Sequence, residues 1–288
     1  VSNSSIVLYM PFDENYNSTF TFDYTNNSND GTLIGGVTFN STSCVYGNCY
    51  TFDGVDDYIN ALDINALDGL TTMTVSAWIR IPTLATNKAI ITKWNPHAVQ
   101  TSWGLQTDSV NSDELQMFIA ESITSSGGQQ ALTTDANLVT NTWYHVVAVF
   151  NGNGAANSDK LKIFVGGVEK SMSYVGTIPA TLTSSTAPVE IGRFGDLSRY
   201  WNGNIDEVMI WNTALNATHV SDIYKNQTSR FSPSGTMNYT NVNFGGNDTI
   251  NITLAGCQQN LGSSLRASVN NGAFVSFDSN CFLQEYNA

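Results

Sequence analysis

The chain has 288 residues, which suits one β-sandwich of the usual size together with a smaller second unit. Charged residues make up 12% of the sequence, and eleven Lys and Arg against 24 Asp and Glu give a net charge of −13. Without a basic stripe, nucleic acid and anionic membrane are poor partners, whereas an acidic surface favours a cation such as Ca²⁺.

Alternation with a period of two residues predicts β-strands along the first two thirds of the chain. It occurs in residues 74–81, 144–150, 160–165 and 207–211. In the first stretch Val75, Ala77, Ile79 and Ile81 share one face. Clusters of Gly, Asn, Asp and Ser separate these stretches, as they do in antiparallel sandwiches with one face of each sheet in the core.

A single short helix is expected at residues 216–224. Asn216 is a suitable N-terminal cap, and Val220, Ile223 and Tyr224 follow at helical spacing. The composition then changes to a linker at residues 231–235. Four further strand candidates follow at residues 237–244, 249–254, 264–269 and 274–277. We therefore divide the chain into a sandwich at 1–230 and a small β-rich module at 231–288.

The four cysteines form two local pairs, Cys44 with Cys49 and Cys257 with Cys281. Neither pair has histidines at zinc-site spacing, so two disulfides are the favoured interpretation, and they imply an oxidising compartment. The second disulfide would stabilise a module whose core is thin.

Glycosylation sequons support an extracellular or cell-surface location. None lies between residues 40 and 216, so glycans would cluster at the ends of the sandwich and on the small module. No apolar stretch has transmembrane length and no signal peptide precedes Val1, so we expect a mature chain or a fragment. The sequons are Asn3, Asn17, Asn26, Asn40, Asn216, Asn226, Asn238, Asn247 and Asn251.

Several motifs in order resemble those of laminin-G-like, or concanavalin A-like, jelly-roll domains. They cover residues 6–226 and do not extend to the small module. The resemblance implies an all-β fold: a two-sheet antiparallel jelly-roll sandwich, here followed by a small C-terminal disulfide-stapled β module. The motifs are residues 8–14, 23–33, 52–59, 75–79, 143–147, 191–193 and 203–208, the last of which continues into 211–215.

The same resemblance implies one structural calcium ion between the loop after the first strand and the last strand. The ligands that it implies are Asp23, Asn26 and Asn29 on the loop and Asp206 on the strand. Calcium takes six to eight oxygen ligands, which such a loop can supply. The alternative is that Asp23 and the asparagines form Asx turns with their own backbone.

An active site is not expected. Glucanases of this fold carry Glu-X-Asp-X-X-Glu on one strand, and no such segment occurs. The pairs Asp113-Glu114 and Asp206-Glu207 should point to opposite faces of a strand. Asp56-Asp57 belongs to a motif where a turn role is favoured, and His145 is expected to be a packed, hydrogen-bonded strand residue.

Saccharide recognition needs flat aromatic faces and planar polar groups. The aromatic residues that the sequence places on variable loops are Trp94, Trp103, Tyr200 and Trp201, although Trp103 and Trp201 could instead cap the core. We therefore expect a secreted or cell-surface, non-catalytic recognition or adhesion domain whose partner is a glycan or a cell-surface glycoprotein.

The alternative is a structural subunit of an extracellular filament or surface layer that binds copies of itself by strand exchange. Residues 1–7 are the candidate for the donated strand, although they could equally be ordinary N-terminal sequence.

Overall fold

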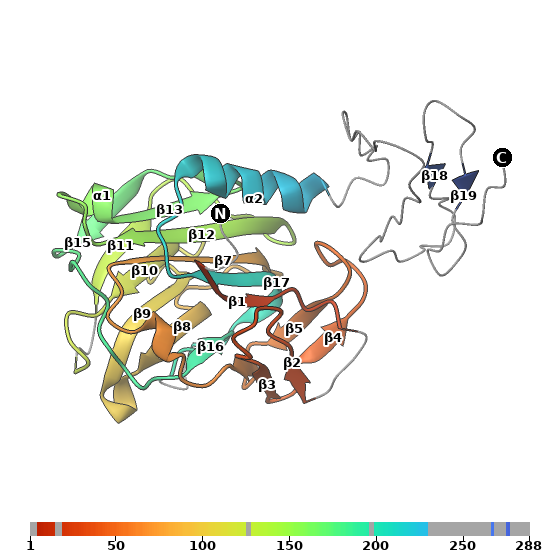
Figure 1. The fold of residues 1–288 in the computed structure, drawn as a ribbon, viewed down its shortest axis with the longest axis horizontal. Coiled ribbons are helices and arrows are strands. Elements are labelled where there is room, and N and C mark those ends of the chain that lie inside the picture. The colour runs from red at the N-terminus through yellow and green to blue at the C-terminus, as the bar shows by residue number, and fades with distance from the viewer. Residues whose placement is uncertain are drawn as a thin grey trace, which may run out of the picture. The chain divides into compact units, whose positions relative to one another are not determined.

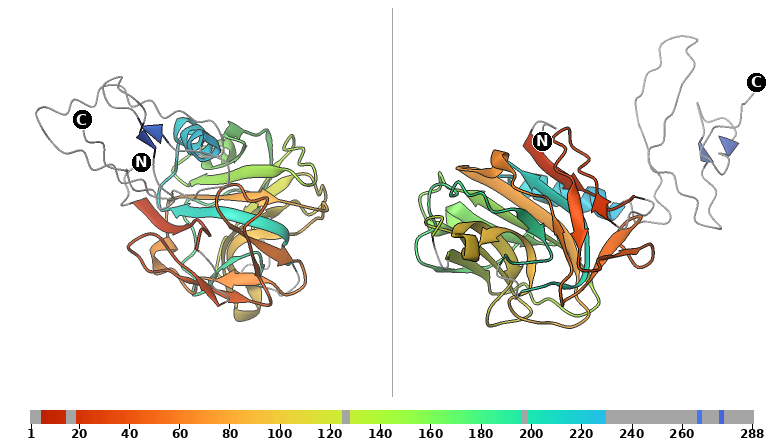
Figure 2. Two further views of the ribbon diagram at one scale, coloured as in Figure 1. Left: turned by 90° about the vertical axis from the view of Figure 1, so that its right-hand side faces the viewer. Right: turned by 90° about the horizontal axis from the view of Figure 1, so that it is seen from below.

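The computed structural model describes residues 5–14, 19–124, 128–195 and 199–229, together with 266–267 and 275–276. The chain divides into two compact units, Val1–Gly235 and Thr236–Ala288. The first unit consists of two antiparallel sheets that lie face to face (Figures 1 and 2). The predicted two-sheet antiparallel sandwich is therefore confirmed.

The eight-stranded sheet contains most of the strands that the alternation predicted. Its central strand β7 pairs with β12 on one side and with β17 on the other. In spatial order the sheet consists of β14 (Val168–Glu169), β13 (Leu161–Val165), β12 (Trp143–Asn151), β7 (Thr72–Arg80), β17 (Asn202–Trp211), β5 (Cys49–Asp53) and β4 (Thr38–Asn40), with β1 (Ile6–Met10) beside β17.

The nine-stranded sheet combines hairpins with pairings between strands far apart in the chain, such as those of β16. This strand pairs with both β6 and β8. In spatial order the sheet consists of β15 (Met172–Val175), β11 (Gln129–Thr133), β10 (Leu115–Ile119), β9 (Gln100–Thr107), β8 (Ala89–Asn95), β16 (Val189–Ile191), β6 (Tyr58–Asn60), β3 (Gly31–Ile34) and β2 (Phe20–Thr21).

The core lies between the two sheets, and the predicted inward face of β7 contributes Val75, Ala77 and Ile79 to it. The outer face of β7 is buried as well, because Thr74 and Ser76 have no exposed surface and Trp78 is 4% exposed. The sequence suggested that this face would meet solvent. A helix covers it instead.

That helix is α2 (Ala217–Ser229), which lies along the outer face of the eight-stranded sheet (Figure 1). It begins after Asn216, whose Oδ1 accepts a hydrogen bond of 2.8 Å from the backbone N–H of His219, so the predicted cap is confirmed. Val220 is fully buried against Phe164 and Trp211 of the sheet. The remaining helical elements are α1 (Asn157–Lys160) and the 3₁₀ turns η2 (Asn65–Leu67) and η3 (Pro96–Ala98).

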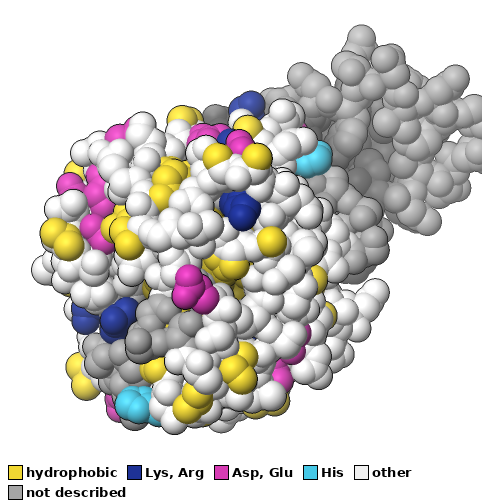
Figure 3. Space-filling model, turned by 90° about the vertical axis from the view of Figure 1, so that its left-hand side faces the viewer, with side chains coloured by type: hydrophobic (Ala, Val, Ile, Leu, Met, Phe, Trp, Pro, Cys, Tyr) yellow, Lys and Arg dark blue, Asp and Glu magenta, His cyan; other side chains and the backbone are white. Residues whose placement is uncertain are grey.

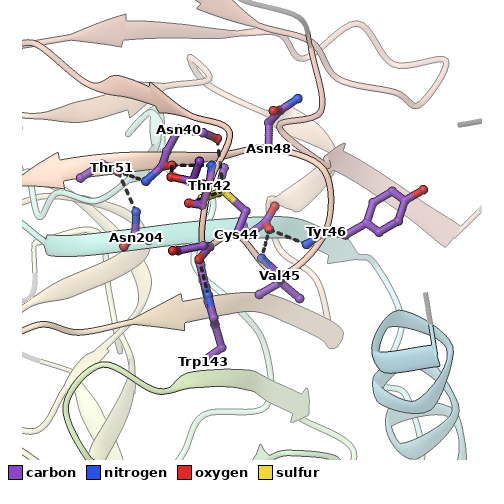
Figure 4. Close-up of a disulfide and its surroundings, with 12 residues drawn as sticks. Asn40, Thr42, Cys44, Val45, Tyr46, Asn48, Thr51, Trp143 and Asn204 are labelled. Carbon is purple, nitrogen blue, oxygen red and sulfur yellow. Dashed lines mark hydrogen bonds between the residues drawn. A yellow bond between two sulfur atoms is a disulfide. The ribbon is translucent and has the colours of Figure 1, made fainter. Parts of the chain in front are cut away.

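The predicted disulfide between Cys44 and Cys49 is present, with a Cα–Cα distance of 5.5 Å. It closes a short loop before β5, and Figure 4 shows Trp143 reaching this loop from β12. The indole Nε1–H of Trp143 donates a hydrogen bond of 2.8 Å to the carbonyl oxygen of Ser43. The loop is therefore attached to its sheet by both covalent and hydrogen bonds.

Strand β1 pairs within its own sandwich, opposite the second half of β17. Ile6 lies opposite Trp211 and Leu8 opposite Ile210, and the N–H of Asn212 donates to the carbonyl of Ser5. Residues 5–7 are thus already paired in their own sheet, which counts against their donation to another copy, whereas residues 1–4 lie outside the described residues; strand exchange stays a prediction.

In the second unit, β18 (Arg266–Ala267) pairs antiparallel with β19 (Val275–Ser276), within two of the four predicted strand ranges. The predicted disulfide Cys257–Cys281 lies outside the described residues.

Four of the predicted sequons are described. The side chains of Asn26, Asn216 and Asn226 are exposed and that of Asn40 is half-buried. The other sequons, Asn3, Asn17, Asn238, Asn247 and Asn251, lie outside the described residues.

Candidate functional site

Three of the four predicted sugar-binding aromatic residues are buried. Trp103 has no exposed surface, Trp201 is 1% exposed and Trp94 is 2% exposed. Trp94 lies on β8 rather than on a loop, and its ring contacts Phe118 and Phe194 at 4.9 and 5.8 Å between centroids. A ring with almost no exposed face cannot stack on a sugar, so these three predictions are corrected. Tyr200 remains half-exposed.

The predicted calcium loop is held together by its own hydrogen bonds. The carboxylate of Asp23 accepts four, from the N–H groups of Tyr9, Thr25 and Asn29 and from the hydroxyl of Thr25. A carboxylate has about four lone-pair positions, so all of them have donors. This arrangement is the Asx-turn alternative, and Asn26 beside it is exposed.

Asp206, the fourth predicted calcium ligand, has its own set of donors. It is fully buried, and its carboxylate accepts the backbone N–H groups of Val45, Tyr46 and Glu207. Burial, followed by the neighbouring Glu207 carboxylate, raises the pKa of Asp206 well above its usual range. The donors to Asp23 and the donors to Asp206 are different groups, and calcium at this loop stays a prediction.

A pocket of about 240 Å³ opens beside the turn between β5 and β6. Its wall includes Lys88 and Asn202, which offer a cationic and a planar polar group. The indole Nε1–H of Trp201 has no hydrogen-bond acceptor among the described residues. The complete lining is Gly54, Ile81, Thr83, Ala85, Lys88, Thr107, Trp201 and Asn202.

Two partly exposed tyrosines and an arginine form a cluster. One of the tyrosines, Tyr200, directly precedes Trp201 of the pocket lining in the sequence. The Tyr58 and Tyr200 rings lie 6.4 Å apart, and the guanidinium carbon of Arg193 lies 4.2 Å from the Tyr58 ring centroid. The Nε of Arg193 also lies 3.5 Å from the Oε2 of Glu190. We call Tyr58, Glu190, Arg193 and Tyr200 the tyrosine–arginine cluster. It combines flat aromatic faces with a planar cation.

Only Tyr200 of this cluster was singled out from the sequence. Tyr58 and Arg193 stood in motifs that suggested a structural role, and the signal that could have selected them is their residue type. Strand pairing explains the meeting: β16 pairs with β6, so Glu190 lies opposite Asn60, close to Tyr58. The sequence does not give this pairing, because the two strands are far apart along the chain.

Glu190 is 3% exposed, and its burial raises its pKa to about 7 against the opposing effect of Arg193. As pH rises from about 4.5 to 7, the unfolded chain loses this proton and the folded chain keeps it, so the folded state loses stability. We expect Glu190→Gln to remove this loss, a relative gain of about 2–3 kcal/mol in the free energy of unfolding at pH 8 compared with pH 4.

Urea unfolding at both pH values measures this effect, with Glu121→Gln on the exposed surface as the control. Equal pH dependence in Glu190→Gln and the wild type would contradict the buried, protonated glutamate.

The scarcity of basic side chains on the described surface agrees with the negative net charge of the sequence. On the face drawn in Figure 3, Lys and Arg side chains are few among polar, hydrophobic and acidic ones. None of the described helices combines the length and the hydrophobicity needed to cross a bilayer.

Comparisons with known proteins agree with this architecture. The family model of the concanavalin A-like lectin/glucanases superfamily matches residues 53–221. None of the curated proteins is a significant match.

Among solved structures, the binding domain of Paraclostridial Mosquitocidal Protein 1 is similar with a TM-score of 0.58 and 13% identity. The botulinum neurotoxin serotype D ligand binding domain in complex with N-acetylneuraminic acid has a TM-score of 0.56 and 16% identity. The binding domain of botulinum neurotoxin DC in complex with rat synaptotagmin II has a TM-score of 0.56 and 15% identity.

Each alignment covers 78% of this chain and 52% of the matched chain, so the chain spans about half the length of these domains. At these identities the likeness shows the fold.

Proposed function

The chain belongs to the concanavalin A-like lectin/glucanase superfamily, and from this we propose that it is a non-catalytic, extracellular recognition domain for a glycan or glycoprotein. The observation that carries the proposal is the tyrosine–arginine cluster, where two half-exposed rings and a guanidinium share one surface. Aromatic faces match the apolar faces of sugars, and the guanidinium donates to hydroxyl or carboxylate oxygens.

The pocket whose lining includes Trp201, the sequence neighbour of Tyr200, supports the same proposal. Its volume of about 240 Å³ suits part of a saccharide rather than a drug-sized ligand. Asn202 and Lys88 supply hydrogen-bonding groups at its wall. A toxin domain of this fold is known in complex with N-acetylneuraminic acid, which makes an acidic sugar a reasonable first probe.

The acidic residues near the tyrosine–arginine cluster in the sequence favour a binding site over a hydrolytic one. Retaining hydrolysis needs two carboxyl groups on either side of the scissile bond. One carboxylate oxygen from each of Asp53, Asp56 and Asp57 lies within 4.8 Å of the others, yet the three residues occupy a single turn and Asp57 is 3% exposed. The buried carboxyl of Glu190 faces Arg193 instead of a second acid.

The extracellular part of the proposal is supported by the Cys44–Cys49 disulfide and by the exposed sequon residues Asn26, Asn216 and Asn226. Disulfides persist in oxidising compartments and are rare in the cytosol.

We expect Tyr58→Ala and Tyr200→Ala each to weaken glycan binding by about ten-fold or more, since aromatic anchors dominate binding energy in such surfaces. A glycan array followed by calorimetry on the best hit measures this. Tyr46→Ala, a half-exposed tyrosine in the disulfide loop, is the matched control and should bind like the wild type. Retention of full affinity in both variants would place the binding site elsewhere.

A further inference from the structure

The turn between β5 and β6 brings three aspartates together. Asp53, Asp56 and Asp57 each offer one carboxylate oxygen, and these oxygens lie within 4.8 Å of one another. Calcium–oxygen distances are about 2.3–2.6 Å, so two ligands on opposite sides of one ion are separated by about 5 Å at most. The three oxygens are therefore close enough to share a single ion.

One of these carboxylates has an oxygen without a partner. Asp57 is 3% exposed; its Oδ2 accepts the backbone N–H of Asp53 at 2.8 Å, whereas its buried Oδ1 has no hydrogen-bond donor. Buried polar atoms in native proteins nearly always have partners, because a buried and unsatisfied one is costly. A cation within reach of the Oδ1 oxygen of Asp57 would supply the partner that it lacks.

The charge of the turn is also uncompensated by protein groups. Among the described residues, no Lys or Arg forms an ion pair within 4.0 Å with any of the three aspartates. Burial raises the pKa of Asp57, and the neighbouring Asp53 and Asp56 charges raise it further. Such mutual repulsion is relieved when a divalent cation binds between the carboxylates.

A neighbouring glycine turn lies close against these residues. Gly35 and Gly36 have φ values of +90° and +150°, and their backbone packs against the aspartate turn. A Cβ at Gly35 would lie 2.3 Å from the carbonyl oxygen of Asp56, and one at Gly36 would lie 3.4 Å from the Oδ1 of Asp57. Glycine at these two positions therefore leaves the space that the aspartate turn occupies.

We propose that Asp53, Asp56 and Asp57 form a calcium-binding site, with backbone carbonyls and water completing the coordination. Calcium fits better than magnesium, since Mg²⁺ requires near-ideal octahedral geometry and gives up its water reluctantly. The site is distinct from the loop of Asp23 and goes beyond the proposed function, which it does not require.

Calorimetric titration of the full chain with CaCl₂ after chelator treatment tests the proposal, with MgCl₂ as a parallel titrant. Asp56→Asn and Asp57→Asn should each weaken calcium binding by about ten-fold or more, as loss of a ligand-supporting group already costs that much in metal sites. Asp222→Asn, which removes one exposed charge from α2, is the control and should leave the affinity unchanged.

Asp57→Asn could disturb the fold because Asp57 is buried, but Asp56 is exposed and its variant keeps the test informative. Absence of calcium binding by the wild type, or unchanged affinity in Asp56→Asn, would overturn the proposal. A chain that binds calcium without retaining any glycan would contradict the proposed function alone, so the two failures are distinguishable.

Discussion

Replacing Trp103 with Ala should lower the free energy of unfolding by about 3–5 kcal/mol, the usual cost of removing a large buried aromatic side chain. Trp103 lies on β9, opposite Ile119 of β10, and has no exposed surface. Its ring belongs to the main core between the sheets. The loss of stability has two parts, since the burial of the ring is lost and a cavity remains behind.

Chemical denaturation followed by tryptophan fluorescence measures this change. All six tryptophans precede residue 236, so their emission reports on the sandwich alone. Tyr200→Ala, at a half-exposed position, is the comparison and should cost less than about 1 kcal/mol. If Trp103→Ala kept its stability and lost glycan binding, the sequence-based assignment of Trp103 to the binding surface would be restored.

Acidification should destabilise the sandwich through His145. The imidazole is fully buried between Trp78 and Tyr224, whose ring centroids lie 5.3 and 6.0 Å away. Neither ring nitrogen has a hydrogen-bond partner among the described residues. This corrects the expectation of a hydrogen-bonded histidine. Burial lowers the pKa of His145 to about 3, so the folded protein holds the neutral ring.

The loss of stability on acidification follows from the protonation of His145 in the folded and the unfolded chain. At pH values above about 6.5 the ring is neutral in both the folded and the unfolded chain. Below that pH the unfolded chain binds a proton that the folded chain excludes, and stability falls by about 1.4 kcal/mol per pH unit until the folded pKa is reached. At pH 4 the loss is about 3 kcal/mol relative to pH 7.

His145→Leu should remove this loss, because leucine fills a similar volume and does not titrate. Urea unfolding of the wild type and of His145→Leu at pH 7 and pH 4 measures how far their pH dependence differs. In that difference the contributions of the other titrating groups largely cancel. His97→Leu, on an exposed turn, controls for the removal of a surface histidine. Parallel pH profiles for wild type and His145→Leu would show that His145 is charged or solvated in the folded state.

The contribution of Glu190 to the free energy of unfolding depends on pH in the opposite direction from the contribution of His145. Protonated Glu190 is favoured by folding, whereas protonated His145 is disfavoured. The two groups lie on different sheets, Glu190 on β16 and His145 on β12. Their variants can therefore be combined to test whether the two contributions add, as expected for separate sites.

The sequence by itself determined the fold class, the capped helix and the disulfide of Cys44 with Cys49. These depend on local patterns: alternation places Val75, Ala77 and Ile79 on one face, and Asn216 caps the helix that follows it. The ordered motifs added the jelly-roll topology. Such features follow from residues close together in the chain, and they are readable before the chain folds.

Only the tertiary structure decided which side chains remain available for binding. Trp94 is covered by Phe194 from a distant loop, and the outer face of β7 is covered by α2. Tyr58 meets Arg193 because β16 pairs with β6. Exposure of a strand residue depends on what packs over it, and that partner comes from elsewhere in the chain. Alternation along a strand therefore cannot show which residues remain exposed. Where a strand is buried on both faces, alternation does not distinguish the two faces.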